Sequence, residues 1–240
     1  MNASGPSIIA RSASVIGREH VRIGKNNQDG WAVVQREGHT VGVIADGCSS
    51  QPCSEVGARL ATQFWAEWVS QQFNENSGDL AANAMTALVE WVRETAQRLV
   101  MGSTRLEDVI EKYFLFTVQC AVVTPGRTLV FGQGDGVVSV DGRVTQLDSG
   151  VSNAPEYPAY WALSREPARA TVHADGPAQV CVLATDGLNS HGSTLNHLAT
   201  DPLVWSNPAH LQRKLNVFAA QERLGDDATV LMLRVPELRS

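Results

Sequence analysis

The amino-acid sequence predicts an α+β fold in which two antiparallel β-sheets carry helices on their outer faces. Two observations favour this class: long helical segments follow a first group of strands, and a second group of short strands separated by turns comes after them. The 240 residues, 43% of them apolar, are enough to bury one continuous core. Because no repeat and no linker-like stretch interrupts them, residues 1–240 are predicted to form a single domain.

The first third of the chain is expected to contain three strands and then helices. Strands are predicted over residues 7–15, 31–36 and 40–45, where β-branched side chains are frequent. Long helices are predicted over residues 56–73 and 80–99, because apolar side chains recur there at spacings of three and four. The expected helix starts are the N-caps Ser54 and Asp79 and, for a third and shorter helix, the capping-box pair Thr104 and Glu107.

The second half of the chain is dominated by short apolar runs between turn residues, which is typical of strands. Four consecutive runs are predicted to pair as an antiparallel meander, over residues 114–123, 128–131, 137–140 and 144–147. The remaining expected elements are strands over residues 170–173, 180–185 and 228–235 and a helix over residues 208–221.

Composition and charge exclude several classes of function. The net charge is −6 and no basic cluster is present, so a nucleic-acid-binding surface is not expected. No apolar run is long enough to span a membrane and the first residues do not resemble a secretory signal, so a cytoplasmic protein is expected. The four cysteines form no CxxC pair and are expected to be reduced thiols. The motifs of serine hydrolases, P-loop nucleotidases and zinc proteases are absent.

Aspartate followed by glycine is strongly over-represented. Six of the twelve aspartates precede a glycine, whereas random order would place about one there. Asp141-Gly142 and Asp175-Gly176 stand between strand-like runs and are interpreted as hairpin turns. These two pairs are therefore assigned to structure.

Asp46 and Asp186 differ from those pairs, because each ends a buried apolar run and is followed by polar residues. A third acidic point, Asp226-Asp227, stands just before the last apolar run. Carboxylates fixed by rigid strands, with glycines that let carbonyl groups and water approach, suit a hard cation such as Mg²⁺ or Mn²⁺. Taken together, these acids predict a divalent metal site.

Five motifs follow one another along the chain: Gly17 to Asp29 with His20 and Gln28, Ala45 to Ser50 followed by Ser54, Gly57 and Ala58, Gly134 to Gly136, Ala184 to Gly187, and Gly225 to Val230. In this order they resemble the motifs of the metal-dependent protein phosphatases of type 2C (PPM), in a bacterial branch with a G-x-x-H…Q-D first motif. The resemblance covers nearly the whole chain.

This resemblance implies an αββα sandwich with a two-metal site between the sheets, occupied by Mn²⁺ or Mg²⁺, and a third, loosely held ion. It implies catalytic roles for Asp46, Asp186 and Asp226. The residues implied as metal ligands are Asp29, Asp46, Gly47 through its carbonyl group, Asp135, Asp186 and Asp226. The implied reaction is hydrolysis of protein phosphoserine and phosphothreonine by an activated water, and the implied counterpart is a bacterial Ser/Thr kinase or its targets.

Three positions depart from the family pattern. Gln28 stands where other members carry a glutamate that binds the second metal, and Cys48 stands where animal members carry a histidine proposed to protonate the leaving group. The phosphate-binding arginine has no direct equivalent. Arg22 and His20 are the candidates preferred for this role, with Arg18 and Lys25 as further ones.

The region of about residues 149–164 corresponds to the variable flap of the family. Its aromatic residues are equally compatible with packing of a loop and with contact to the substrate.

Two alternative functions remain. The weaker metal binding expected of Gln28 motivates the first, a pseudophosphatase that binds phosphoproteins without hydrolysing them. A phosphohydrolase of small molecules is the second.

Overall fold

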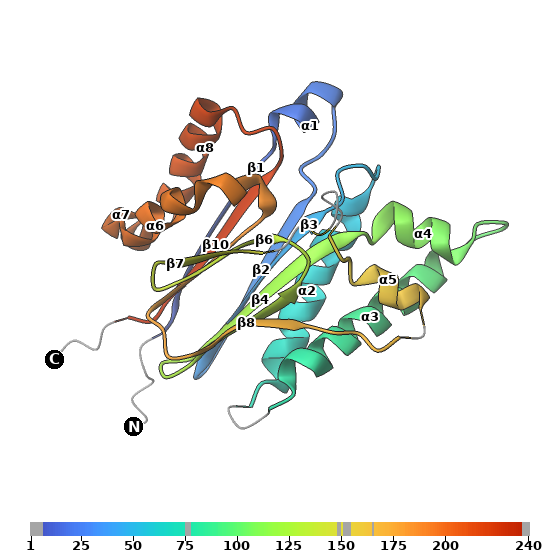
Figure 1. Cartoon of the computed structure of the whole chain (residues 1–240), viewed down its shortest axis with the longest axis horizontal. Coiled ribbons are helices and arrows are strands. Elements are labelled where there is room, and N and C mark those ends of the chain that lie inside the picture. The colour runs from blue at the N-terminus through green and yellow to red at the C-terminus, as the bar shows by residue number, and fades with distance from the viewer. Residues whose placement is uncertain (1–6, 75–77, 148–149, 151–154, 165, 237–240) are drawn as a thin grey trace.

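The computed structural model describes residues 7–74, 78–147, 150, 155–164 and 166–236. Two five-stranded sheets lie face to face, and helices cover the outer face of each (Figure 1). Every strand pairing is antiparallel. The predicted fold class is therefore confirmed. No helix in the described ranges is both long and apolar enough to cross a bilayer.

Each sheet combines strands from distant parts of the chain. The first sheet has the order β1 (Ile9–Val15), β10 (Ala228–Arg234), β9 (Val180–Ala184), β6 (Gly136–Val140) and β7 (Arg143–Leu147). The second sheet has the order β2 (Asp29–Arg36), β3 (His39–Gly47), β4 (Phe116–Val123), β5 (Thr128–Gln133) and β8 (Thr171–Gly176).

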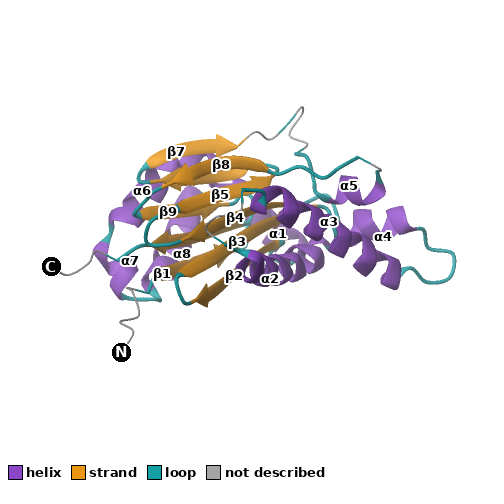
Figure 2. Cartoon of the chain, turned by 90° about the horizontal axis from the view of Figure 1, so that it is seen from below, coloured by secondary structure: helices purple, strands orange, loops and turns teal. Residues whose placement is uncertain are grey.

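The helices are divided between the two outer faces, as Figure 2 shows. The second sheet is covered by α2 (Ser54–Gln72) and α3 (Leu80–Leu99), beside which lie α4 (Leu106–Tyr113) and α5 (Ala159–Leu163). The first sheet is covered by α6 (Gly192–Thr200), α7 (Pro202–Ser206) and α8 (His210–Glu222). The short helix α1 (Arg18–Ile23) lies between β1 and β2 in the chain.

The core has three layers because both sheets are covered on both faces. Trp65 of α2 packs between the helices and the second sheet, and Leu211 of α8 packs between the helices and the first sheet. A third cluster, which contains Ala121 of β4 and Leu231 of β10, lies between the two sheets. All eight residues of β4 are consequently buried.

The predicted meander is wrong in its pairing. β4 and β5 belong to the second sheet, whereas β6 and β7 form a hairpin in the first, so the chain changes sheets at Gly134-Asp135. β6 pairs instead with β9. Pairing between segments 40 residues apart depends on contacts that no local pattern encodes.

Of the two Asp-Gly pairs interpreted as hairpin turns, the structure confirms one and contradicts the other. Asp141-Gly142 joins β6 to β7 with φ of 47° and 82°, as a tight hairpin turn requires. Asp175 and Gly176 do not form a hairpin, because they belong to β8 and pair with β5. β9 follows them in the chain but lies in the other sheet.

Helix starts shift slightly from the predicted positions. Ser54 is the first residue of α2 and not its cap, because its hydroxyl donates to the Cys48 carbonyl. Asp79 occupies the N-cap position of α3 without a side-chain cap bond. At α4 the predicted capping box moves by one residue: the Asp108 carboxylate accepts from the backbone N–H of Arg105 at 3.2 Å. Helices that the sequence analysis did not predict are α1, α5, α6 and α7.

Candidate metal centre

The acids singled out in the sequence lie where strands from both sheets end. Asp29, the first residue of β2, is paired in register with Asp46 near the end of β3. Asp186 begins a 3₁₀ turn (Asp186–His191) after β9, and Asp226 lies just before β10. Since β9 and β10 are antiparallel neighbours, the end of one meets the start of the other. Asp135 lies where the chain crosses between the sheets.

Four of these acids line one hollow of about 190 Å³. The lining residues are Asp46, Gly47, Cys48, Ser49, Ser50, Thr117, Asp135, Pro155, Tyr157, Asp186 and Asp226. None of these described lining residues carries a cationic side chain. Four carboxylates therefore face one small space without a positive side chain on its wall.

Two carboxylate oxygens in this region are buried and have no hydrogen-bond partner among the described residues: Oδ1 of Asp29 and Oδ1 of Asp186. The other oxygen of Asp29 accepts from the Thr185 hydroxyl at 2.9 Å. A buried anion without a partner is costly, and such groups are normally compensated by a proton, an ion or water.

Four of the acids in this region have pKa values above the ordinary range of an aspartate. Burial, together with the charges of Asp29 and Asp186, holds the pKa of Asp46 well above its usual range. Burial raises the pKa of Asp29 to about 8 and that of Asp135 to about 6. The pKa of Asp226 is raised by burial and by the charge of Asp186. Divalent cations would remove this repulsion, so these oxygen ligands fit Mn²⁺ or Mg²⁺.

The metal-free protein is expected to lose stability as the pH rises. Asp29 has a pKa of about 8 in the folded chain against 3.8 ordinarily, so the folded state binds more protons between these values. The free energy of unfolding should then fall across this window. Thermal melting in EDTA at about pH 5 and about pH 8 measures the effect, and Asp29→Asn should reduce it. A melting temperature that rises over this window would contradict the prediction.

Two glycines allow the acid-bearing segments to approach closely. A Cβ atom on Gly47 would lie 2.8 Å from the Gln28 carbonyl and from the Ser54 hydroxyl. A Cβ atom on Gly187 would lie only 2.0 Å from the Asp227 carbonyl oxygen. Glycine after Asp46 and Asp186 therefore serves backbone packing, which is a different role from the turn at Asp141-Gly142.

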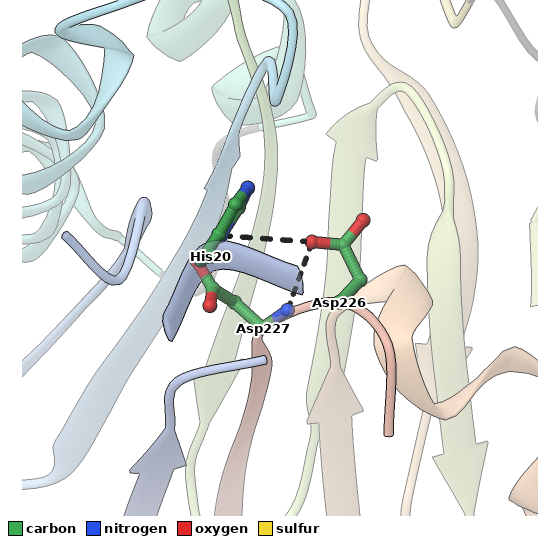
Figure 3. A group of neighbouring side chains, drawn as sticks. All are labelled: His20, Asp226 and Asp227. Atoms are coloured by element: carbon green, nitrogen blue, oxygen red, sulfur yellow. Dashed lines mark hydrogen bonds and ion pairs between the residues drawn. The ribbon is translucent and has the colours of Figure 1, made fainter. Parts of the chain in front are cut away.

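Asp227 lies next to Asp226 but has a different environment (Figure 3). It is buried, and its carboxylate accepts from the backbone N–H groups of Gly17 at 2.7 Å and Gln28 at 2.6 Å. Nδ1 of His20 lies 2.9 Å from the same carboxylate. Asp227 thus joins the start of β10 to the segment around α1. The sequence analysis counted this residue only as part of the acidic doublet Asp226-Asp227 and did not predict its structural role.

The candidates for phosphate binding do not line the hollow. His20 is buried against Asp227, and its Nδ1 is 4.0 Å from Asp226. Arg22 is 72% exposed and pairs with Glu19, as does Arg18. The phosphate-binding roles of Arg22 and His20 stay predictions, and the geometry gives them no support.

Gln28 and Lys25 hold the loop that follows β3. The Gln28 amide donates to the Gln51 carbonyl at 3.0 Å and to the Ser54 hydroxyl at 2.7 Å. The Lys25 ammonium donates to the Gln51 carbonyl at 2.7 Å and to the Ser49 carbonyl. The Gln28 side chain is therefore directed towards the start of α2, and it is not among the residues that line the hollow.

Gln28→Glu is expected to destabilise the protein without improving the metal site. A carboxylate cannot donate to the Gln51 carbonyl, so the free energy of unfolding should fall by about 1–2 kcal/mol. Denaturant unfolding measures this change, with Gln146→Glu on exposed β7 as the matched control. Tighter Mn²⁺ binding by Gln28→Glu, seen in calorimetry, would show instead that this side chain reaches the ions.

Only part of the predicted flap lies within the described residues. Residues 149, 151–154 and, just after the flap, 165 fall outside them. Pro155 and Tyr157 line the hollow, whereas Trp161 of α5 packs against the core to which α3 contributes.

Cys48 also lines the hollow, and its thiol lies 3.1 Å from the Ser50 hydroxyl. Cys48, Cys53, Cys120 and Cys181 are all free thiols in the structure.

Comparisons with solved structures support this fold. The chain is similar to the serine/threonine phosphatase Stp1 from Staphylococcus aureus, with 14% identity, a TM-score of 0.71 and 97% of each chain covered. It is also similar to the catalytic domain of the serine threonine protein phosphatase PstP in complex with two manganese ions, with 16% identity and a TM-score of 0.61, over 96% of this chain and 100% of that one. A third similar structure is PppA, a regulatory component of the T6SS in Pseudomonas aeruginosa, with 17% identity and a TM-score of 0.57, over 95% and 99% of the two chains.

No curated protein matches the sequence. The model of the protein phosphatase 2C family matches residues 16–226, a span that includes Asp29, Asp46, Asp135, Asp186 and Asp226. The chain therefore belongs to the protein phosphatase 2C family, and it is a metal-dependent serine/threonine protein phosphatase.

Proposed function

We propose that the hollow is the catalytic centre and that Asp46, Asp186 and Asp226 hold Mn²⁺ or Mg²⁺ there. The observation that carries this proposal is the group of four carboxylates that line one small hollow with no cationic side chain among the described lining residues. The pKa values of Asp46 and Asp226 in this group are raised. Asp29 and the Gly47 carbonyl would complete the ligand set. Asp135, on the same hollow, would hold a third ion.

The roles of the individual acids follow from where they are attached. Asp46 belongs to the second sheet, whereas Asp186 and Asp226 follow and precede strands of the first. Ligands from both sheets would therefore meet at one place, where Asp46 would hold the ions together with Asp186 and Asp226. Thr185 fixes Asp29 by donating to one oxygen, which leaves the other available.

When bound, the ions would supply charge neutralisation at phosphorus and lower the pKa of an attacking water. The chain itself supplies the fixed geometry. The Cys48 to Ser54 loop, held by Lys25 and Gln28, keeps Cys48, Ser49 and Ser50 on the rim of the hollow. Hydroxyl groups on this rim can donate to phosphate oxygens. No covalent intermediate on the protein is required.

The substrates are phosphorylated proteins, and we propose that their source is a Ser/Thr kinase whose products this enzyme returns to the unphosphorylated state. Similarity to bacterial enzymes named as serine/threonine phosphatases supports this assignment. A negatively charged protein with no basic cluster has no evident surface for nucleic acid.

Phosphatase activity is expected to require added Mn²⁺ or Mg²⁺ and to disappear in EDTA. The assay is release of phosphate from a phosphothreonine peptide, run beside para-nitrophenyl phosphate. Full activity in EDTA would exclude the metal mechanism. A chain that binds Mn²⁺ and the phosphopeptide without releasing phosphate would be the pseudophosphatase instead. Activity on para-nitrophenyl phosphate alone would favour a phosphohydrolase of small molecules.

A further inference from the structure

Tyr157 is an aromatic residue on the lining of the hollow that the four acids share. It shares this lining with Asp46, Cys48 and Asp186. Its ring meets the Tyr160 ring edge to face, with 5.5 Å between the centroids. Tyr160 is 49% exposed, so the aromatic pair extends from the hollow to the surface.

The segment that carries Tyr157 has little structure of its own. α5 contains five residues, too few for a helix that is stable by itself. Ala159 and Ala162 are buried against the core, which fixes one face of α5. Before α5, the Glu156 carboxylate accepts from the Gln133 amide at 2.7 Å. Contacts outside the segment therefore decide where Tyr157 lies.

Arg93 makes the main polar contacts at the other end of α5. From the middle of α3, its guanidinium donates to the carbonyl groups of Ala162 at 2.9 Å, Trp161 at 3.1 Å and Ser164 at 3.5 Å. The last carbonyl groups of a helix have no partner within that helix, so Arg93 satisfies these groups and ties α5 to α3. α3 is a rigid support, because it is 20 residues long and buries one face.

We propose that Arg93 is a positioning residue for the substrate: by holding α5, it keeps Tyr157 against the hollow, where the phenol contacts the phosphorylated residue of a protein substrate. This inference rests on the proposed function and adds a recognition element to it. Arg93 is not among the residues that line the hollow, so its effect passes through α5. The ligands for the ions lie on other segments, and metal binding should not depend on Arg93.

The test compares Arg93→Ala and Arg93→Lys with Arg98→Ala, an exposed arginine on the last turn of the same helix. The substrates are a phosphothreonine peptide and para-nitrophenyl phosphate, in saturating Mn²⁺. Arg93→Ala should raise KM for the peptide about tenfold and change kcat less than about twofold. Turnover of para-nitrophenyl phosphate and the Mn²⁺-induced rise in melting temperature should stay at wild-type values. Arg93→Lys should restore part of the loss, and Arg98→Ala should behave as wild type.

Tyr157→Ala tests the same inference without touching the tie between α3 and α5. It should raise the peptide KM as Arg93→Ala does, and the double variant should be no worse than Tyr157→Ala, because both changes remove one interaction. An unchanged peptide KM in Arg93→Ala, additive effects in the double variant, or equal losses on both substrates would overturn the inference. Wild-type protein that hydrolyses neither substrate would instead contradict the proposed function and the inference with it.

Discussion

Asp46→Asn and Asp186→Asn are expected to lower phosphopeptide turnover by at least ~100-fold, because each removes a proposed ligand of the ion that would activate water. The same substitutions should not destabilise the metal-free protein. Asp46 and Asp186 lie close together and raise each other's electrostatic energy, so removing one charge relieves repulsion. The change in stability should therefore reverse its sign when Mn²⁺ is added.

Thermal melting of wild type and both variants, in EDTA and in millimolar Mn²⁺, measures this reversal beside the phosphopeptide assay. Asn has nearly the shape of Asp, so packing is preserved and the difference reports the charge. Asp141→Asn is the matched control, because asparagine supports the same hairpin turn. If both variants melt below wild type in EDTA and keep the full Mn²⁺ shift, the aspartates are structural residues and the metal site is elsewhere.

Asp227→Asn should have the opposite effect on the metal-free protein, although Asp227 is the immediate neighbour of a proposed ligand. Its buried carboxylate accepts from two backbone N–H groups, those of Gly17 and Gln28. An amide keeps one oxygen and directs an NH₂ group towards a donor, so at least one buried N–H loses its partner. We expect the free energy of unfolding to fall by about 3 kcal/mol, with or without metal.

Denaturant unfolding of Asp226→Asn and Asp227→Asn in EDTA separates the two roles directly. Asp226 has a raised pKa from burial and from the charge of Asp186, so its neutral variant should be as stable as wild type or more so. Asp227→Asn should unfold at clearly lower denaturant concentration. Equal stability of the two variants would show that the contacts of Asp227 do not determine how α1 and β10 are held together.

The sequence alone determined the features that depend on short-range patterns. The spacing of apolar residues located α2 and α3, and alternating runs with turn residues located most strands, because one buried face imposes its period on the chain. The Asp-Gly pair at Asp141 was interpreted correctly, since a two-residue turn is a local structure. The sequence also pointed to Asp46, Asp186 and Asp226 as one group, through the position of each beside an apolar run.

Only the tertiary structure decided which segments meet. It divided the expected meander between two sheets and placed Asp175 inside a strand, because strand partners are chosen by long-range packing. It also showed which way individual side chains point. Gln28 has the position of a ligand in the sequence but donates to the loop after β3, and Arg22 is turned to Glu19.

Residues that act through distant contacts left the weakest signal in the sequence. Asp227 contacts residues about 200 positions earlier in the chain, and Arg93 contacts carbonyl groups about 70 positions later. The partners in these contacts are mostly backbone groups, which every residue possesses and no sequence motif marks. Local patterns therefore indicated the elements and the acids of the proposed site, whereas the contacts that hold Asp227 and α5 in place became visible only in the folded chain.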